Sequence, residues 1–117
     1  MQKPRDEYIR HAEVVRVVDG DTIRLRVDLG FNTQVTQNFR LWGIDAPELR
    51  GDERVDGLKA KEFLSSIVWE RNDVYIQTYK TDKYGRYVAK VWRGPSFVNQ
   101  MLVDHGHAVW VEKYKTT

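Results

Sequence analysis

The sequence contains no cysteine, only 3 prolines and no long apolar run. Without cysteine, a disulfide scaffold, a thiolate metal site and a thiol nucleophile are all excluded. No segment approaches the roughly 18 consecutive apolar residues that a membrane-spanning helix needs, so no membrane association is expected. Residues 1–10 are mostly charged or polar and lack the apolar stretch of a signal peptide. The net charge of +2 is too small to indicate a polyanionic partner by itself.

The overall composition is that of a globular protein, and we expect one domain covering residues 1–117. Hydrophobic residues make up 41% of the chain and charged residues 31%. A chain of this length buries roughly two-thirds of its unfolded surface, which is enough for one core. No repeat and no linker divides it, and no heptad or apolar seam indicates a partner subunit, so we expect a monomer.

The first half of the chain shows the period of two that is typical of strands. Residues 11–18 are rich in valine, and residues 23–29 alternate between apolar and charged side chains. Residues 30–33 resemble a turn, and a third alternating segment follows at 35–41. Short turns between successive strands predict an antiparallel meander.

The second half mixes helical and strand patterns. Helical spacing places Ala60, Phe63, Leu64, Ile67 and Val68 on one face, with Asp56 as the expected cap. Two strands are expected at 74–79 and 87–92. Ser96 is expected to cap a second helix, and Gly106 to end it. This order predicts a mainly β, α+β domain: a five-stranded OB-type barrel with two or three helices.

The first acidic motif, Asp19-Gly20-Asp21-Thr22, lies between the first two strands. Asp and Gly favour tight turns for backbone reasons alone, so a plain turn is one interpretation. An EF-hand is a poor alternative, because the twelfth position of such a loop would be Gly30 instead of the required glutamate.

The second motif follows the third strand and contains Arg40, Asp45, Ala46, Pro47 and Glu48. Taken alone, it is a surface arginine beside an acidic turn. Two acidic turns at the edge of one small barrel can converge, however, and carboxylates with a backbone carbonyl suit a hard cation such as Ca²⁺. The absence of His and Cys from both motifs disfavours zinc.

The third motif is Thr81-Asp82-Lys83-Tyr84-Gly85-Arg86. It has the composition of an ordinary charged hairpin. Lys83 and Arg86 are also suited to gripping phosphate oxygens, and Tyr84 offers a ring to a base or sugar.

Taken together, in this order and spacing, the three motifs resemble the staphylococcal nuclease (thermonuclease) family, and the similarity runs from about Val14 to Trp110. The resemblance implies an OB-fold, a Ca²⁺ cofactor, DNA and RNA as substrates, and hydrolysis of phosphodiesters that leaves 3′-phosphate products.

The resemblance also implies a role for each matching residue. The implied metal ligands are Asp21, Asp45 and the backbone carbonyl of Ala46, with Asp19 acting through water. Arg40 and Arg86 match the phosphate-binding arginines, and Glu48 matches the glutamate that activates or orients the attacking water. Lys83, Tyr84 and Tyr114 match substrate-binding positions.

Some features depart from the family pattern or are discounted. The hairpin around residues 30–38 is longer, and Glu112 stands where a nucleotide-stacking aromatic residue is expected. His105 and His107 flank the end of the second helix, where a role at the helix terminus is favoured over a metal site. The four tryptophans are expected to be too dispersed to form a stacking ladder.

The competing hypothesis is a catalytically inactive OB-fold module that binds nucleic acid or protein. Inactive copies of such domains lose the acids or the arginines, whereas this chain keeps all five side chains: Asp21, Asp45, Glu48, Arg40 and Arg86. The sequence therefore favours the active nuclease.

Overall fold

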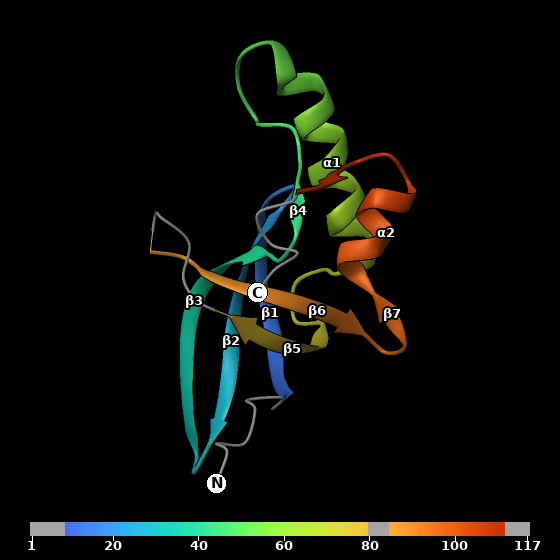
Figure 1. Cartoon of the computed structure of the whole chain (residues 1–117). Coiled ribbons are helices and arrows are strands. Elements are labelled where there is room, and N and C mark those ends of the chain that lie inside the picture. The colour runs from blue at the N-terminus through green and yellow to red at the C-terminus, as the bar shows by residue number, and fades with distance from the viewer. Residues whose placement is uncertain (1–8, 80–84, 112–117) are drawn as a thin grey trace, which may run out of the picture.

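A computed structural model describes residues 9–79 and 85–111 of the protein (Figure 1). The strands are β1 (Arg10–Asp19), β2 (Thr22–Gly30), β3 (Thr33–Leu41), β4 (Ile44–Asp45), β5 (Asp73–Tyr79), β6 (Tyr87–Arg93), β7 (Ser96–Phe97) and β8 (Val109–Trp110). The helices are η1 (Gly51–Glu53), α1 (Arg54–Ile67) and α2 (Val98–Asp104).

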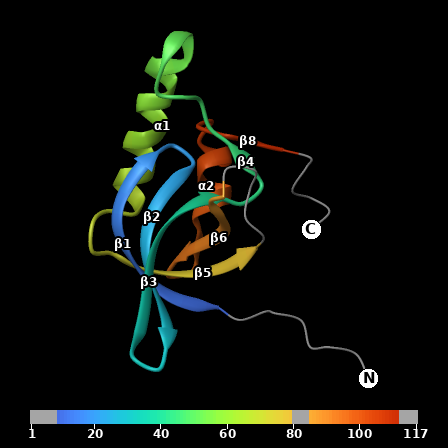
Figure 2. The same ribbon diagram turned by 90° about the vertical axis from the view of Figure 1, so that its left-hand side faces the viewer.

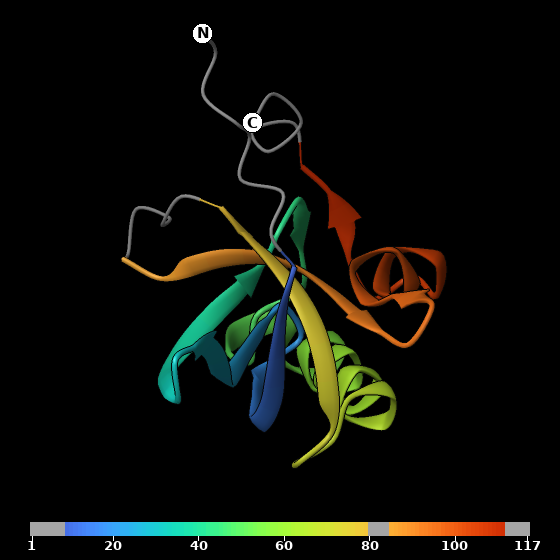
Figure 3. The same ribbon diagram turned by 90° about the horizontal axis from the view of Figure 1, so that it is seen from below.

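Five strands close into a barrel, which confirms the predicted OB-type fold. The hydrogen-bonded order is β3-β2-β1-β5-β6, and a parallel pairing between β3 and β6 closes the ring (Figure 3). A closed barrel has no free sheet edge and encloses one core. The two α-helices pack against it, α1 on β1 and α2 on β6.

The core contains the residues that the alternating pattern placed on the inner face. Ile23, Leu25 and Val27 of β2 are buried, as are Phe39 and Leu41 of β3. Their neighbours on the other face are polar, because successive side chains on a strand point in opposite directions.

The β2–β3 hairpin extends beyond the barrel at the end opposite α1 (Figure 2). Phe31 and Asn32 both have positive φ, 54° and 60°, which fits the two-residue turn expected at residues 30–33. Leu29 was expected on the core face, but it is exposed because this part of the hairpin has no barrel wall behind it. Phe31 is fully exposed at the tip.

Both predicted helix caps are wrong. α1 begins three residues earlier than expected, with Glu53 at the cap position, so Asp56 lies inside the first turn. Ser96 pairs with Arg93 of β6, and α2 begins only at Val98. α1 starts early because it continues directly from η1, and Ser96 is not a cap because it pairs with β6. The predicted end of α2 is confirmed, because Gly106 follows it with a positive φ of 76°.

Within the described parts of the chain, no helix combines the length and the apolar character needed to span a membrane.

Candidate active site

One open cleft of about 1080 Å³ collects residues from all three sequence motifs. Its lining includes every described residue that the sequence assigned to a metal or phosphate role: Asp19, Asp21, Arg40, Asp45, Ala46, Glu48 and Arg86. These residues come from the β1–β2 turn, the end of β3, the segment around β4 and the start of β6. Tertiary folding therefore brings together side chains that are up to 67 residues apart in the sequence, from Asp19 to Arg86.

The β1–β2 turn fixes the Asp21 carboxylate by hydrogen bonds. The Asp19 side chain closes the turn by accepting the Asp21 backbone N–H at 3.1 Å. Asp21 Oδ2 accepts the backbone N–H of Ala46 at 2.9 Å, which ties the first motif to the second. The backbone carbonyl of Asp21 also accepts the N–H of Leu41 at 2.8 Å. Asp21 is therefore oriented by backbone contacts from two other segments.

Burial raises the pKa of Asp21 to about 6. Removal from water is the largest cause, and a hydrogen bond and negative charge from Asp19 also raise it. The N–H of Ala46 and the charge of Arg40 oppose this rise. Burial therefore outweighs the two contacts that stabilise the ionised carboxylate.

Arg40 lies between the two candidate metal ligands. Its Nη2 lies 3.5 Å from Asp21 Oδ2 and also forms an ion pair with Asp45 Oδ1. The same nitrogen donates to the carbonyl of Ile44 at 3.0 Å. The side chain is only 12% exposed, and its buried Nε has no hydrogen-bond partner among the described residues. A buried N–H without a partner is uncommon in folded proteins, and it marks this arginine as a candidate functional residue.

Arg86 reaches the same cleft from the start of β6. Its Nη1 donates to the hydroxyl of Thr22 at 3.4 Å, and Thr22 donates to Asp21 Oδ1 at 3.3 Å. Thr22 is also the direct register partner of Arg40 on β3. Both arginines are thus neighbours of the buried Thr22, Arg40 as its partner on the adjacent strand and Arg86 through a side-chain hydrogen bond.

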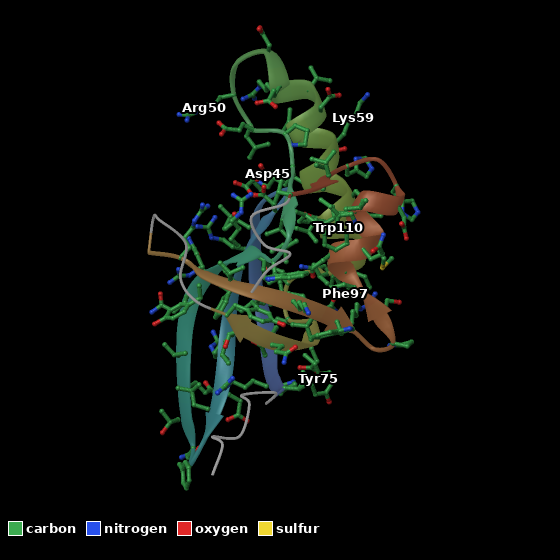
Figure 4. All side chains as sticks on the ribbon, viewed as in Figure 1. Asp45, Arg50, Lys59, Tyr75, Phe97 and Trp110 are labelled. Atoms are coloured by element: carbon green, nitrogen blue, oxygen red, sulfur yellow. The ribbon has the colours of Figure 1, made fainter. Side chains whose placement is uncertain are left out.

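Glu48 lies in the loop after β4 and faces open solvent. Its Oε2 accepts a hydrogen bond from Arg50 Nε at 3.1 Å, an ion pair that the sequence did not indicate. Figure 4 shows Arg50 on the loop beyond Asp45, on the way to α1. Exposed pairs of this kind are weak, so Glu48 can exchange this partner for water or substrate.

Helix α1 holds the two acidic segments in place by close packing. A Cβ on Gly57 would collide with the carbonyl oxygen of Glu48, and a Cβ on Gly20 would lie 2.7 Å from Cβ of Ala60. Both glycines therefore permit an approach that no larger residue allows. Gly57 and Ala60 are buried on the face of α1 turned toward the site.

The donors in the cleft fit a hard cation. Asp21 and Asp45 point their carboxylates at one common position, held here by the Arg40 nitrogen. Carboxylate and carbonyl oxygens are the ligands that Ca²⁺ prefers. Among residues 9–79 and 85–111, no group of three or more His, Cys, Asp or Glu side chains is arranged to hold a metal ion. Carbonyl, water or substrate oxygens would therefore have to complete the coordination.

Three predicted substrate-binding residues, Lys83, Tyr84 and Tyr114, lie outside the described residues, as does Glu112. Conversely, the cleft lining includes Arg50, Glu53 and His107, which the sequence did not assign to the site. They join it through packing of the loop before α1 and the segment after α2. We find no local sequence signal that would have identified them.

Two of the four tryptophans meet, but edge to face at an interplanar angle of 67°, which is not the geometry of a stacking ladder. Trp42 contacts Trp110 and Tyr79, with ring centroids 6.2 Å and 5.7 Å apart, and the ammonium group of Lys90 lies 4.3 Å from the Trp42 ring. Pairing of β4 with β8 brings these rings together, which no local pattern could indicate. His105 and His107 stack on the Phe63 ring at 4.6 Å and 4.7 Å.

Comparison with known proteins agrees with this geometry. A family model described as staphylococcal nuclease homologue matches residues 38–117. An uncharacterized endonuclease from Escherichia coli O157:H7 is 35% identical over 108 residues, which is 91% of this chain and 64% of that protein. A thermonuclease from Staphylococcus hyicus is 32% identical over 100 residues, covering 82% of this chain and 56% of that protein.

The protein ParB of Escherichia coli is 35% identical over 111 residues, covering 87% of this chain and 57% of that protein. The chain thus spans about 56% to 64% of the length of these three curated relatives. Because the family model covers well over half of the chain and the barrel and cleft agree with it, this protein belongs to the staphylococcal nuclease homologue family.

Proposed function

We propose that this domain is a Ca²⁺-dependent nuclease that hydrolyses the phosphodiester bonds of DNA and RNA and leaves 3′-phosphate products. The observation that carries the proposal is the convergence of Arg40 and Arg86 with Asp21, Asp45 and Glu48 on one cleft. The nuclease names of several relatives support it, because they describe proteins that share this domain.

The two arginines bind the scissile phosphate. A phosphodiester is already an anion and repels an incoming water oxygen, so positive groups beside it lower the barrier. Guanidinium groups suit this role because their planar forks bind two oxygens and keep their proton. Arg40 and Arg86, which both line the cleft, supply such donors. Their contribution grows as negative charge accumulates on the phosphate in the transition state.

Asp21, Asp45 and the carbonyl of Ala46 would hold the calcium ion, with Asp19 acting through water. When bound, Ca²⁺ supplies positive charge that offsets the phosphate and orients water. Asp45, which pairs with Arg40 in this structure, would be shared between that guanidinium group and the ion.

Glu48 orients the attacking water and takes up its proton. The water oxygen forms a bond to phosphorus, the bond from phosphorus to the 5′ oxygen breaks, and the leaving oxygen receives a proton from solvent. The 59% exposure of the Glu48 side chain suits this role, because it leaves room for water beside the carboxylate.

The test is cleavage of end-labelled single-stranded DNA and RNA by the purified domain with Ca²⁺, and with excess EGTA. We expect cleavage only with Ca²⁺, and products that a polymerase extends only after phosphatase treatment. Arg86→Ala, purified identically, controls for a contaminating nuclease. Tight binding without cleavage in Ca²⁺ would instead support the inactive binding module.

A further inference from the structure

A second pair of arginines lies beside the cleft, on the outer face of the barrel. Arg16 of β1 and Arg24 of β2 are direct register partners in the antiparallel pair. Residues directly opposite each other in a regular ladder place their side chains on the same face, with Cβ atoms roughly 5 Å apart. A β-bulge between Val14 and Arg16 adjoins this pair, and bulges are a common means of redirecting side chains. Arg16 is exposed and Arg24 is half-buried, so both reach solvent.

No carboxylate among the described residues neutralises this pair. Arg24 Nη1 donates to the neutral side-chain oxygen of Asn38 at 3.0 Å. The side chain of Arg16 forms no hydrogen bond or ion pair within residues 9–79 and 85–111. Like charges directly opposite on a sheet are destabilising, so the fold tolerates a local cost at this position.

The next row of the same face is different. Arg26 is one register step further from the cleft, and it forms an ion pair with Glu13 at 2.7 Å. The β1–β2 face is therefore not uniformly basic. Its positive charge is neutralised at Arg26, further from the cleft, and has no counterion at Arg16 and Arg24, which are nearer to the cleft.

The Arg16–Arg24 pair is one step from the phosphate-binding row. Thr22 and Arg40 are register partners, and so are Arg24 and Asn38, two residues further along the same two strands. Two residues of an antiparallel strand span roughly 7 Å. The contact with Asn38 uses one N–H of Arg24 and leaves others for a ligand, because a guanidinium group has five.

We propose that Arg16 and Arg24 form a second phosphate subsite, which binds the backbone of a single nucleic-acid strand as it leaves the cleft along β2. This inference rests on the proposed function, because it takes the substrate to be a polynucleotide. The subsite reads no base, since its donors suit phosphate oxygens. It gives the enzyme higher affinity for a long strand than for a short fragment.

The test measures binding of a fluorescently labelled single-stranded DNA of about 12 nucleotides by anisotropy, in EDTA so that cleavage is not required. The variants are Arg16→Gln/Arg24→Gln and the charge-preserving Arg16→Lys/Arg24→Lys, with Arg26→Gln as the matched control on the same face. Losing charged hydrogen bonds of this kind should lower the affinity of the double glutamine variant by about tenfold. Because each phosphate contact on a single strand contributes roughly 0.7 to the slope of log K against log salt, the slope should also become shallower.

The expected results are a weakened double glutamine variant with a shallower salt slope, a lysine variant that keeps most of that slope, and Arg26→Gln within about twofold of wild type. Thermal unfolding distinguishes a binding role from a structural one. The unfolding midpoint of the double glutamine variant should not fall below that of wild type, because the substitution removes a repulsive pair. Equal affinity and slope for wild type and the glutamine variant would overturn the subsite, as would an equal loss in Arg26→Gln or no binding by wild type. Failure of the proposed function is seen separately, as absence of cleavage by wild type with Ca²⁺.

Discussion

Arg50 donates from Nε to Oε2 of Glu48 at 3.1 Å, so the proposed water-activating carboxylate has an arginine partner from its own loop. The two side chains are 87% and 59% exposed, which makes the pair weak. We expect Arg50→Gln to change kcat by less than about threefold, because an exposed pair contributes little.

Glu48→Gln should instead lower kcat by on the order of 10²- to 10⁴-fold, since it removes the proton acceptor and keeps the shape. Steady-state kinetics on one oligonucleotide compare the two variants. An equal loss of kcat in both variants would mean that catalysis depends on the Glu48–Arg50 ion pair and not on the Glu48 carboxylate alone.

Arg86→Ala should lower kcat/KM by on the order of 10²- to 10³-fold, the usual effect of removing one transition-state donor. Arg86 is half-buried at the rim of the cleft, and its hydrogen bond to Thr22 is long, at 3.4 Å. The far-ultraviolet circular dichroism spectrum and the thermal midpoint should therefore stay close to wild type. A near-wild-type rate would remove Arg86 from the mechanism.

The raised pKa of Asp21 makes the stability of the metal-free protein dependent on pH. The pKa is 3.8 ordinarily and about 6 in the folded protein, so between these values the folded state holds the proton more tightly than the unfolded state. This contribution to stability is therefore fully present below about pH 4 and is lost as pH rises through 6.

Asp21→Asn, which mimics the protonated acid, should be more stable than wild type above pH 6, and the gap should close toward pH 4. The rise in pKa corresponds to roughly 3 kcal/mol at neutral pH. Urea unfolding in EDTA at several pH values measures the gap. A difference that does not vary with pH would show that ionisation of Asp21 is not its cause.

Gly57→Ala should destabilise the protein by about 1–3 kcal/mol, the usual cost of overpacking. Replacing glycine by alanine inside a helix normally stabilises the protein by roughly 0.5–1 kcal/mol. A destabilised Gly57→Ala variant would therefore indicate close packing at this position. Here the added Cβ meets the carbonyl oxygen of Glu48, and the helix must shift away from the loop that carries this residue.

Lys59→Ala, two positions along α1 and exposed, is the matched control, with an expected change within about 0.5 kcal/mol. Urea unfolding gives the stability of each variant, and kcat shows whether Glu48 moves with the helix. A stabilised Gly57→Ala would contradict the close packing.

Much of the fold follows from local patterns in the sequence. Alternation at Ile23, Leu25 and Val27 predicted β2 and its buried face, because the period of two comes directly from strand geometry. The same logic failed at Leu29, where the hairpin leaves the barrel. It also failed at the caps Asp56 and Ser96, because α1 continues from η1 and Ser96 pairs with β6. Local preferences are worth about 1 kcal/mol, which tertiary contacts readily exceed.

For the site, the sequence by itself determined the chemical groups: two acidic turns, two arginines and a glutamate, with oxygen donors and no thiol. Only the tertiary structure decided how these groups meet. It set the Arg40 guanidinium between Asp21 and Asp45, buried Asp21 enough to raise its pKa, and placed Arg16 opposite Arg24 without a counterion. The physical reason is that charge interactions and desolvation depend on distances between distant segments, and barrel closure sets those distances.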